Sequence, residues 1–379
     1  MERSKTNILF IEEFLNPSTG GVQRVTISLA NYLKNYGISS FFCYSDFDYE
    51  VIDDKNKLKI NIHSKENNII YKDILDFAIK NNISIIIVQD IATQQIQYCL
   101  EKLRLEQCIK SIYCFHRNPI SSKQQSYNIY YQLKVQTYNI IHGIKPRYDF
   151  IDIINAIDKY IVLSPSYIDT FSNLYRINTN GKFASIANPV PFDPSPLDLL
   201  AKEKTVLIIT RFQECVKNIK KAIDIWKKFE KTNNDWQLII GGYGEDYEMV
   251  YNYFVKKKLK RCKFIGKVDN PKELYRKASI YMMTSRHEGY PMVILEAMEY
   301  GCIPIVYDSF TSIHDIIENG TNGLIIKPYS TKQYVQGLLD LTTDNSKRER
   351  MARNAYNTII SSNTKEAICS QWIELFKSL

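Results

Sequence analysis

Two of the carboxylates in residues 284–302, TSRHEGYPMVILEAMEYGC, have a spacing that could serve chemistry. Glu288 and Glu296 are separated by seven residues. A carboxylate accepts hydrogen bonds only, and it can hold two neighbouring hydroxyl groups. The N-terminus of a helix attracts anions. Two carboxylates that flank such a helix end therefore suit a molecule in which a phosphate lies between hydroxyl-bearing groups.

The residues around this pair predict where each carboxylate lies. Residues 279–285 (SIYMMTS) predict a strand, so Glu288 is expected in the loop that follows. Pro291 fits the first position of a helix, where its missing N–H costs nothing. Gly301 fits the position just after the helix end. Glu296 is then about a turn and a half into the helix. A sugar nucleotide, with its diol, phosphate and diol in sequence, matches this arrangement.

Elements that could position the pair alternate along the whole chain. Short β-rich runs are followed by longer helical patterns, which is typical of a parallel sheet with helices on both faces. Residues 185–198 (SIANPVPFDPSPLD) interrupt the alternation with four prolines between positions 189 and 196. Proline excludes helix and favours extended backbone. We therefore predict a connection between two domains at this point.

The predicted fold class is α/β, with two doubly wound, Rossmann-like domains facing across a cleft, where ligands usually bind in such folds. The predicted bounds are 1–187 for the first domain, 188–200 for the connection, 201–355 for the second domain, and 356–379 for a C-terminal helix that crosses back to the first domain.

The segment EGYPMVILEAMEYGCIPIV resembles the E-x7-E motif of family 4 retaining glycosyltransferases of the bacterial surface-polysaccharide type, which have the GT-B fold. TRFQECVKNIKKAIDIW resembles the Arg…Lys segment that opens the second domain of that family. FIGKVDNPKELYRKASIYMMTS resembles its base-binding loop, helix and strand, and DSFTSIHDIIENGTNGLIIKP its closing unit. The match is specific over about 205–330. In the first domain, GGVQRVTISLANYL, YIVLSPSYIDTF and ANPVPF match more loosely.

The resemblance implies a role for each matched residue. Glu296 would bind the ribose hydroxyls of the donor, and Glu288 would lie at the transferred sugar. Arg211 and Lys217 would neutralise the diphosphate as it leaves, because positioned cations stabilise developing negative charge. The second domain would bind the nucleotide sugar and the first would lie on the acceptor side.

The remaining predicted site residues follow from the same resemblance. Gly20 and Gly21 would let the backbone approach the phosphates closely, and residues 266–268 would frame the base. The full donor-binding set is Gly20, Gly21, Arg211, Lys217, Gly242, Gly266, Lys267, Val268, Glu288, Gly289, Tyr290, Pro291, Met292 and Glu296. The catalytic set is Glu288, His116, Arg211 and Lys217.

Some of these residues have an ordinary structural interpretation as well. His116 ends the predicted strand SIYCFHR, where the resemblance implies contact with acceptor or sugar, but a histidine in that position can also simply bond to the loop backbone. Lys217 precedes a lysine-rich helix face, and Gly20–Gly21 can be a plain turn between strand and helix. The sequence leaves these alternatives open.

A second pattern points to a different glycosyltransferase architecture. In FFCYSDFDYE, Asp46 and Asp48 form a D-x-D pair after an apolar strand, like the metal-binding motif of the GT-A fold. A GT-A enzyme would not carry a second doubly wound domain, so a polar strand end is the favoured interpretation. We therefore predict that no metal is required and that no cofactor is needed besides the substrate, a nucleotide sugar linked to UDP or GDP.

Charge and cysteine content indicate which partners and which cellular compartment the sequence favours. Residues 1–190 carry 21 basic and 18 acidic residues, and residues 191–379 carry 28 and 23, so the net charge of +8 is divided between the halves. No basic stripe of nucleic-acid-binding type is evident. The eight cysteines have no C-x-x-C pair, which favours reduced thiols and a cytoplasmic protein.

The tyrosine-rich segment 123–150 is predicted to line an acceptor groove, to rest on the inner face of an anionic membrane, or to be ordinary packed structure.

These observations lead to one main hypothesis and two alternatives. The main hypothesis is a retaining, metal-independent hexosyltransferase that moves a sugar from a nucleotide sugar to a glycan or lipid-linked acceptor in cell-surface polysaccharide biosynthesis. The alternatives are a GT-B nucleotide-sugar epimerase and an inactive partner subunit that binds sugar nucleotides.

Overall fold

The computed structural model describes residues 6–17, 20–46, 49–62, 66–120, 153–192 and 195–379. The predicted segment 123–150 lies outside these residues. The chain divides into two compact units. Unit 1 comprises Met1–Pro189 and Ile368–Leu379, and unit 2 comprises Val190–Ala367.

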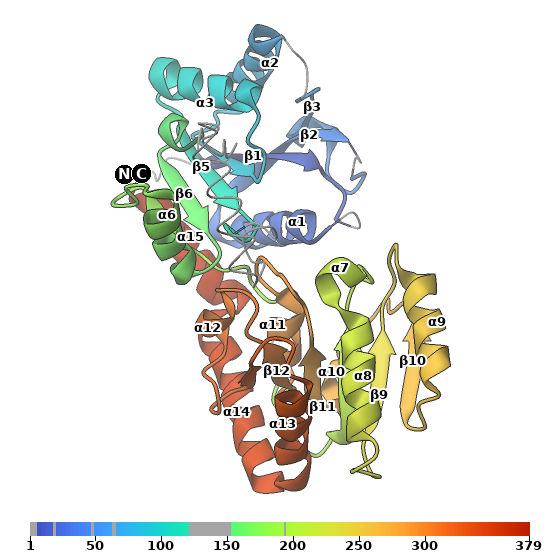
Figure 1. The fold of residues 1–379 in the computed structure, drawn as a ribbon. Helices are drawn as coiled ribbons and strands as arrows, with labels where there is room; N and C mark the ends of the chain where they lie inside the picture. The colour runs from blue at the N-terminus through green and yellow to red at the C-terminus, as the bar shows by residue number, and fades with distance from the viewer. Residues whose placement is uncertain (1–5, 18–19, 47–48, 63–65, 121–152, 193–194) are drawn as a thin grey trace, which may run out of the picture. The chain divides into compact units, whose positions relative to one another are not determined.

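Unit 1 is built on a parallel sheet with the strand order β3-β2-β1-β4-β5-β6-β7 (Figure 1). The strands are β1 (Asn7–Phe14), β2 (Ser39–Asp46), β3 (Lys57–Lys59), β4 (Ile85–Gln89), β5 (Lys110–Phe115), β6 (Lys159–Val162) and β7 (Phe183–Ser185). The helices are α1 (Gly21–Leu33), α2 (Asn67–Lys80), α3 (Gln94–Gln107), α6 (Pro165–Tyr175) and α15 (Lys365–Lys377), with the short 3-10 helices η1 (Lys34–Tyr36), η2 (Asp54–Asn56) and η3 (Ile153–Ala156).

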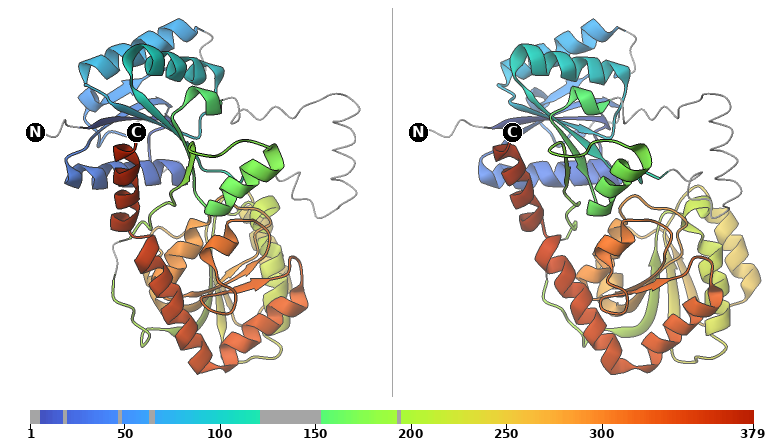
Figure 2. Two further views of the ribbon diagram at one scale, coloured as in Figure 1. Left: turned by 90° about the vertical axis from the view of Figure 1, so that its left-hand side faces the viewer. Right: turned by 60° about the vertical axis from the view of Figure 1, so that its left-hand side comes forward.

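Strand β1 shows why helices cover both faces of this sheet. Side chains along a strand point alternately to opposite faces, and β1 is apolar on both. Ile8 and Phe10 pack in one buried cluster with α1 and with Trp372 of α15. Leu9 and Ile11 pack in another with α2 and α3. In both views of Figure 2 the dark red C-terminal helix accordingly lies beside the blue helix α1.

Unit 2 repeats the design with the strand order β10-β9-β8-β11-β12-β13, again parallel throughout. The strands are β8 (Glu203–Ile209), β9 (Gln237–Gly241), β10 (Cys262–Gly266), β11 (Ala278–Met283), β12 (Ile303–Tyr307) and β13 (Leu324–Ile326). The helices are α7 (Glu214–Lys217), α8 (Ile219–Phe229), α9 (Tyr247–Lys257), α10 (Lys272–Lys277), α11 (Met292–Glu299), α12 (Ile313–Ile316), α13 (Thr331–Thr343) and α14 (Asn345–Ser362).

The two faces of the second sheet are again separated by alternation along one strand. Val206 and Ile208 of β8 pack with Trp226 of α8 and with α13. Leu207, which points the other way, packs with α10, α11 and Ile359 of α14. The predicted α/β class with two Rossmann-like domains is therefore confirmed.

Several predicted elements have different bounds in the structure. The segment TSIHDIIENG, which has a helical pattern within the predicted closing unit, forms an α-helix only over the four residues of α12. Residues 356–379 do not form one helix, because α14 ends at Ser362 and α15 begins at Lys365. The structure adds α3, which the pattern did not single out because its polar residues outnumber the four that it buries. No helix in the described part of the chain is long and apolar enough to span a membrane.

Candidate active site

The edge of the unit 2 sheet at which its strands end gathers most of the predicted donor residues. Because all the strands of this sheet run parallel, the loops that follow β8, β9, β10 and β11 lie at the same edge. The strand order reverses between β8 and β11, and such a switch point is where α/β sheets form ligand sites. Arg211 follows β8, and Glu288 lies in the loop after β11.

Lys217 and Glu288 meet directly at this switch point. Lys217 Nζ lies 2.7 Å from Glu288 Oε1 and 2.9 Å from Oε2, although the residues are 71 positions apart. The side chains are 18% and 11% exposed. A nearly buried pair holds both charges in place, because either charge alone would lose its solvation without compensation. The sequence predicted that both residues belong to the site but not that they form a pair.

A small network explains why the pair forms. The short helix α7 ends at Asn218, whose backbone is left-handed with a φ of 54°. Asn218 Nδ2 donates to the Thr284 carbonyl at 3.2 Å, and Thr284 Oγ1 donates back to the Asn218 carbonyl at 3.0 Å. Arg286 donates to Asn218 Oδ1 and to the Glu214 carbonyl, both at 2.5 Å. These contacts fix α7 against the loop after β11.

The three residues of this network, Asn218, Thr284 and Arg286, were not among the predicted site residues. Their polar side chains at a predicted strand end and helix start were the only signal in the sequence. Asn218 immediately follows Lys217, and Arg286 lies two positions before Glu288, so the network connects the backbone beside each member of the ion pair.

Glu296 lies in the middle of α11 and is 8% exposed. Its Oε2 accepts a hydrogen bond from the hydroxyl of Tyr275 at 3.0 Å. Burial raises the pKa of Tyr275 well above its usual value, so this hydroxyl stays protonated and serves as a donor. The sequence analysis did not single out Tyr275, although it lies in the matched segment that precedes β11.

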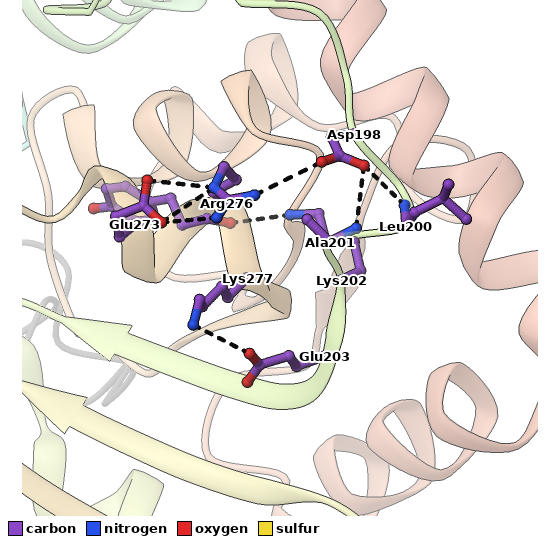
Figure 3. Close-up of polar contacts among 9 residues, drawn as sticks. Asp198, Leu200, Ala201, Lys202, Glu203, Glu273, Arg276 and Lys277 are labelled. Atoms are coloured by element: carbon purple, nitrogen blue, oxygen red, sulfur yellow. Dashed lines mark hydrogen bonds and ion pairs between the residues drawn. The ribbon is translucent and has the colours of Figure 1, made fainter.

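Contacts around the start of unit 2 hold α10 in place, among them the ion pair of Asp198 with Arg276 (Figure 3). Lys202 Nζ donates to the carbonyls of Tyr275 at 3.0 Å and Ala278 at 2.7 Å. Burial lowers the pKa of Lys202. Asp198 accepts from two backbone amides at 3.1 Å and faces Arg276 at 3.7 Å. The connection from unit 1 is thereby tied to α10, the helix that carries the partner of Glu296.

The N-terminus of α11 differs from the prediction. Pro291 is the residue before the helix, with a ψ of 84°, rather than its first helical residue. The Met292 amide donates to the Tyr290 carbonyl and the Ile294 amide to the Pro291 carbonyl, each at 2.9 Å. Fewer amides therefore remain to meet an anion than the sequence suggested. Gly301 has a φ of 68° and follows the helix end, as predicted.

Other predicted donor residues lie in the loops at the same edge. Arg211 is exposed, and its side chain makes no ion pair or hydrogen bond within the described residues. Gly242 has a φ of 140°, and a Cβ there would lie 1.9 Å from the Thr210 carbonyl oxygen, so only glycine fits. Gly266, with a φ of 70°, precedes the exposed Lys267, which pairs with Asp269 at 2.9 Å.

In unit 1, the predicted residues lie at the corresponding edge of the first sheet. Gly20 precedes α1 with extended backbone, at a φ of −174°. A Cβ on Gly20 would meet only the flexible end of Gln23, and a Cβ on Gly21 would meet nothing within 4 Å. The fold of unit 1 therefore does not itself require glycine at these two positions. The close approach of the donor phosphates to this backbone stays a prediction.

His116 follows β5 and lies half-buried beside Gln89 of β4. Its Nε2 lies 2.7 Å from Gln89 Oε1, so the neutral ring donates through Nε2. Nδ1 has no partner in the part of the chain that the structure describes. Burial lowers the pKa of His116 from 6.5 to about 4. The histidine is thus held neutral, and its second nitrogen can accept a hydrogen bond.

Asp90 and Arg117 form an ion pair beside His116. Arg117 Nε lies 3.0 Å from Asp90 Oδ1, which also accepts from the Tyr113 hydroxyl at 3.4 Å. Asp90 has a φ of 57°, an uncommon conformation for a residue other than glycine. Burial raises the pKa of Asp90 to about 6, although Arg117 acts in the opposite direction. The sequence analysis did not identify Asp90.

The D-x-D pair of the alternative architecture is only partly described. Asp46 ends β2 and is exposed, and Asp48 lies outside the described residues. Over residues 6–379, leaving out the undescribed segments, no group of three or more His, Cys, Asp or Glu side chains is placed to hold a metal. The expectation that no metal is required stays a prediction.

Residues 191–358, most of unit 2, match the family model described as Glycosyl transferases group 1. A Bacillus subtilis poly(glycerol-phosphate) alpha-glucosyltransferase is 28% identical over 167 residues, which are 44% of this chain and 25% of that protein. A Haemophilus influenzae protein described as an uncharacterized glycosyltransferase is 24% identical over 341 residues, which cover 86% of this chain and 88% of that one. The chain thus spans a quarter of the first relative and most of the second.

The fold of the whole chain is also similar to solved structures. A crystal structure of Anabaena HepE in complex with UDP superposes with a TM-score of 0.77 at 16% identity, covering 99% of this chain and all of that one. At this identity the likeness shows the fold alone. The chain therefore has the Rossmann-like GT-B fold found in glycosyltransferases.

Proposed function

We propose that the protein is a retaining glycosyltransferase that moves a sugar from a UDP- or GDP-linked donor to a glycan or lipid-linked acceptor in cell-surface polysaccharide biosynthesis. One observation carries this proposal: the paired Lys217 and Glu288 lie at the switch point of unit 2, where the exposed Arg211 follows β8. The match of residues 191–358 to the group 1 glycosyltransferases supports it, as does the relative that glucosylates poly(glycerol-phosphate).

The roles of the residues follow from their charge and position. Arg211 and Lys217 stabilise the diphosphate, which gains negative charge as the bond from the sugar C1 to the phosphate oxygen breaks. Glu288 holds Lys217 and faces the transferred sugar, and the Glu296 carboxylate binds the ribose hydroxyls. These interactions raise the rate to the extent that they strengthen in the transition state.

Retention of configuration constrains the route. A double displacement needs a carboxylate nucleophile on the opposite face of the sugar. The matched segments of unit 1 offer no clear candidate, and the nearest group, His116, is a poor nucleophile for this purpose. We favour a front-face route: the acceptor oxygen bonds to C1 on the side from which the diphosphate leaves. The acceptor proton passes to the departing phosphate oxygen. His116, held neutral, is assigned to contact with the acceptor or the sugar.

The decisive experiment uses the full chain with a panel of UDP- and GDP-sugars. We expect calorimetric binding of one nucleotide and slow release of the nucleoside diphosphate from one donor, above the level of the Lys217→Ala variant. The failure of both UDP and GDP to bind would contradict the proposal. Binding without release in the presence of glycan acceptors would instead favour the inactive partner subunit, and an epimerised sugar nucleotide would favour the epimerase.

Two further measurements test the finer parts of the proposal. Proton NMR of the fresh product is expected to show an α-linkage from an α-linked donor, and a β-linkage would refute retention. Transfer is expected to continue in excess EDTA. Its loss on chelation, with recovery on adding Mn²⁺ or Mg²⁺, would bring back a metal-dependent mechanism involving Asp46 and Asp48.

A further inference from the structure

Nearly all of the net positive charge comes from one part of unit 2. Residues 249–268, MVYNYFVKKKLKRCKFIGKV, contain seven Lys or Arg and no acidic residue. The other 359 residues contain 42 basic and 41 acidic ones. The net charge is divided between the two halves of the chain, but at this finer scale it is concentrated in one segment, which corrects the expectation that it is not concentrated.

The segment forms the end of α9, the following turn and the strand β10, which is the edge strand of the second sheet (Figure 1). Three of its basic residues make ion pairs or hydrogen bonds within unit 2. Lys257 pairs with Asp224 at 2.6 Å, and Lys267 pairs with Asp269. Arg261 donates to backbone carbonyls of neighbouring segments. These three residues have structural roles that explain their presence.

Four other lysines have no such role. They are exposed and have no ion pair or side-chain hydrogen bond within the described residues. They are Lys256, Lys258, Lys260 and Lys263, and we refer to these four as the basic edge. All four lie between the last turn of α9 and the amino-terminal half of β10.

Exposed apolar side chains accompany the basic edge. Of the seven large hydrophobic residues that unit 2 exposes, five lie on α9 or the loops and strand beside it. They are Tyr243, Met249, Tyr251, Val255 and Ile265, with exposed fractions between 40% and 60%. Tyr251 and Val255 are four residues apart on α9 and so share one side of the helix. Val255 is adjacent in sequence to the first lysine of the basic edge.

Two structural explanations account for part of this surface. Lysines near a helix C-terminus interact favourably with the helix dipole, and lysines on an edge strand prevent pairing with another sheet. Neither explains the exposed Val255 beside the lysines, nor a run of twenty residues without one acid. Tyr251 packs against the rings of Tyr247 and Phe264 and is still 40% exposed. Basic and apolar side chains mixed on one exposed surface are what an anionic lipid interface binds.

We propose that the basic edge, with Tyr251 and Val255, is a peripheral docking surface for an anionic membrane. The lysines contact lipid phosphates, and the two apolar side chains enter the headgroup layer. The surface lies at the amino-terminal end of β10, whereas the candidate donor residues follow the carboxyl ends of the strands. Docking therefore does not depend on the proposed glycosyl transfer, and either proposal can fail without the other.

Vesicle co-sedimentation of the full chain tests this proposal. The vesicles contain phosphatidylcholine alone or with phosphatidylglycerol. We expect binding only to the anionic vesicles, and weaker binding as salt is raised, because salt screens exposed charges. The variant Lys256→Gln/Lys258→Gln/Lys260→Gln/Lys263→Gln is expected to bind at least about tenfold more weakly. A matched control that also removes four exposed lysines of unit 2 is expected to bind as the wild type does: Lys227→Gln/Lys228→Gln/Lys231→Gln/Lys332→Gln.

A second variant distinguishes lipid from other polyanions. Val255→Ser keeps every charge and is expected to weaken vesicle binding severalfold while leaving nucleotide affinity unchanged. Undiminished vesicle binding by the lysine variant would overturn the proposal, and so would equal loss in the control variant. If Val255→Ser has no effect and soluble heparin competes fully for the surface, the basic edge binds soluble polyanions and the membrane proposal is wrong.

Discussion

In each of the two parallel sheets, all the strands end at one edge, but the residues at the two edges differ in their chemistry. In unit 2 the edge presents charges: an exposed Arg211 and the ion pair of Lys217 and Glu288. In unit 1 the equivalent edge holds, beside the Asp90–Arg117 ion pair, two groups whose charged forms are disfavoured by burial. His116 has a pKa lowered to about 4, and the fully buried Glu12 of β1 has a pKa raised well above its usual value.

This difference separates two kinds of recognition. Cations near the surface attract and stabilise an anionic group such as a diphosphate, at a cost in solvation that Glu288 offsets for Lys217. Neutral buried donors and acceptors suit hydroxyl groups, which need directed hydrogen bonds rather than charge. Four substitutions test whether the two edges are divided in this way, and they are taken from the largest expected effect to the smallest.

Lys217→Ala is expected to have the largest effect. It removes a positioned cation from the charged edge and takes the lysine partner from Glu288, so we expect kcat for sugar transfer to fall by about 10²–10³-fold. Release of the nucleoside diphosphate under saturating donor measures this. Lys227→Ala, an exposed lysine on the following helix, serves as the control. A kcat near the wild-type value in folded Lys217→Ala would show that the charged edge does not take part in the mechanism.

Glu296→Ala is expected to weaken nucleotide binding rather than turnover of bound donor. The loss of a charge-assisted hydrogen bond to the ribose corresponds to about 1.5–3 kcal/mol, or roughly 10- to 100-fold in Kd. Isothermal calorimetry with the nucleotide measures it. Tyr275→Phe removes only the hydrogen bond to Oε2 and should have a smaller effect. Unchanged affinity in folded Glu296→Ala would show that the ribose role is wrong.

His116→Gln tests the neutral edge through the pH dependence of stability. The folded pKa of His116 is depressed, so its contribution to stability is present above the unfolded value of 6.5 and is lost as the pH falls toward about 4. At pH 5 the wild type has lost about 2 kcal/mol from this source. Urea unfolding at pH 7 and pH 5 should show a decline in the wild type that exceeds the decline in the variant by this amount. Equal declines would mean that His116 is not held neutral.

Asp90→Asn should change the same measurement in the opposite direction. The folded pKa of Asp90 is raised from 3.8 to about 6, so its contribution is fully present below 3.8 and is lost as the pH rises through about 6. Lowering the pH from 7 to 5 therefore stabilises the wild type by about 1 kcal/mol through this group. The variant should lose that gain and decline more steeply than the wild type. A shallower decline would contradict the raised pKa.

The organisation of both units was predictable from the sequence because it depends on local patterns. Alternating strands and helices, the four prolines between positions 189 and 196 and the Glu288–Glu296 spacing are all read along the chain. The predictions that were wrong concern the ends of elements: Pro291, for example, precedes α11 instead of being its first residue. Short helices and caps depend on contacts that a local pattern does not contain. The predicted cleft between the units stays a prediction.

The sequence by itself determined the two doubly wound units and the identity of most candidate donor residues. Periodicity and short motifs are local, because each is contained in a short stretch of consecutive residues. Only the tertiary structure decided which distant side chains meet. The Lys217–Glu288 pair spans 71 residues, and Tyr275 reaches Glu296 from another helix. The neutrality of His116 likewise comes from burial, a property of the surrounding elements. Desolvation and pairing act through space, so spacing along the chain could not reveal them.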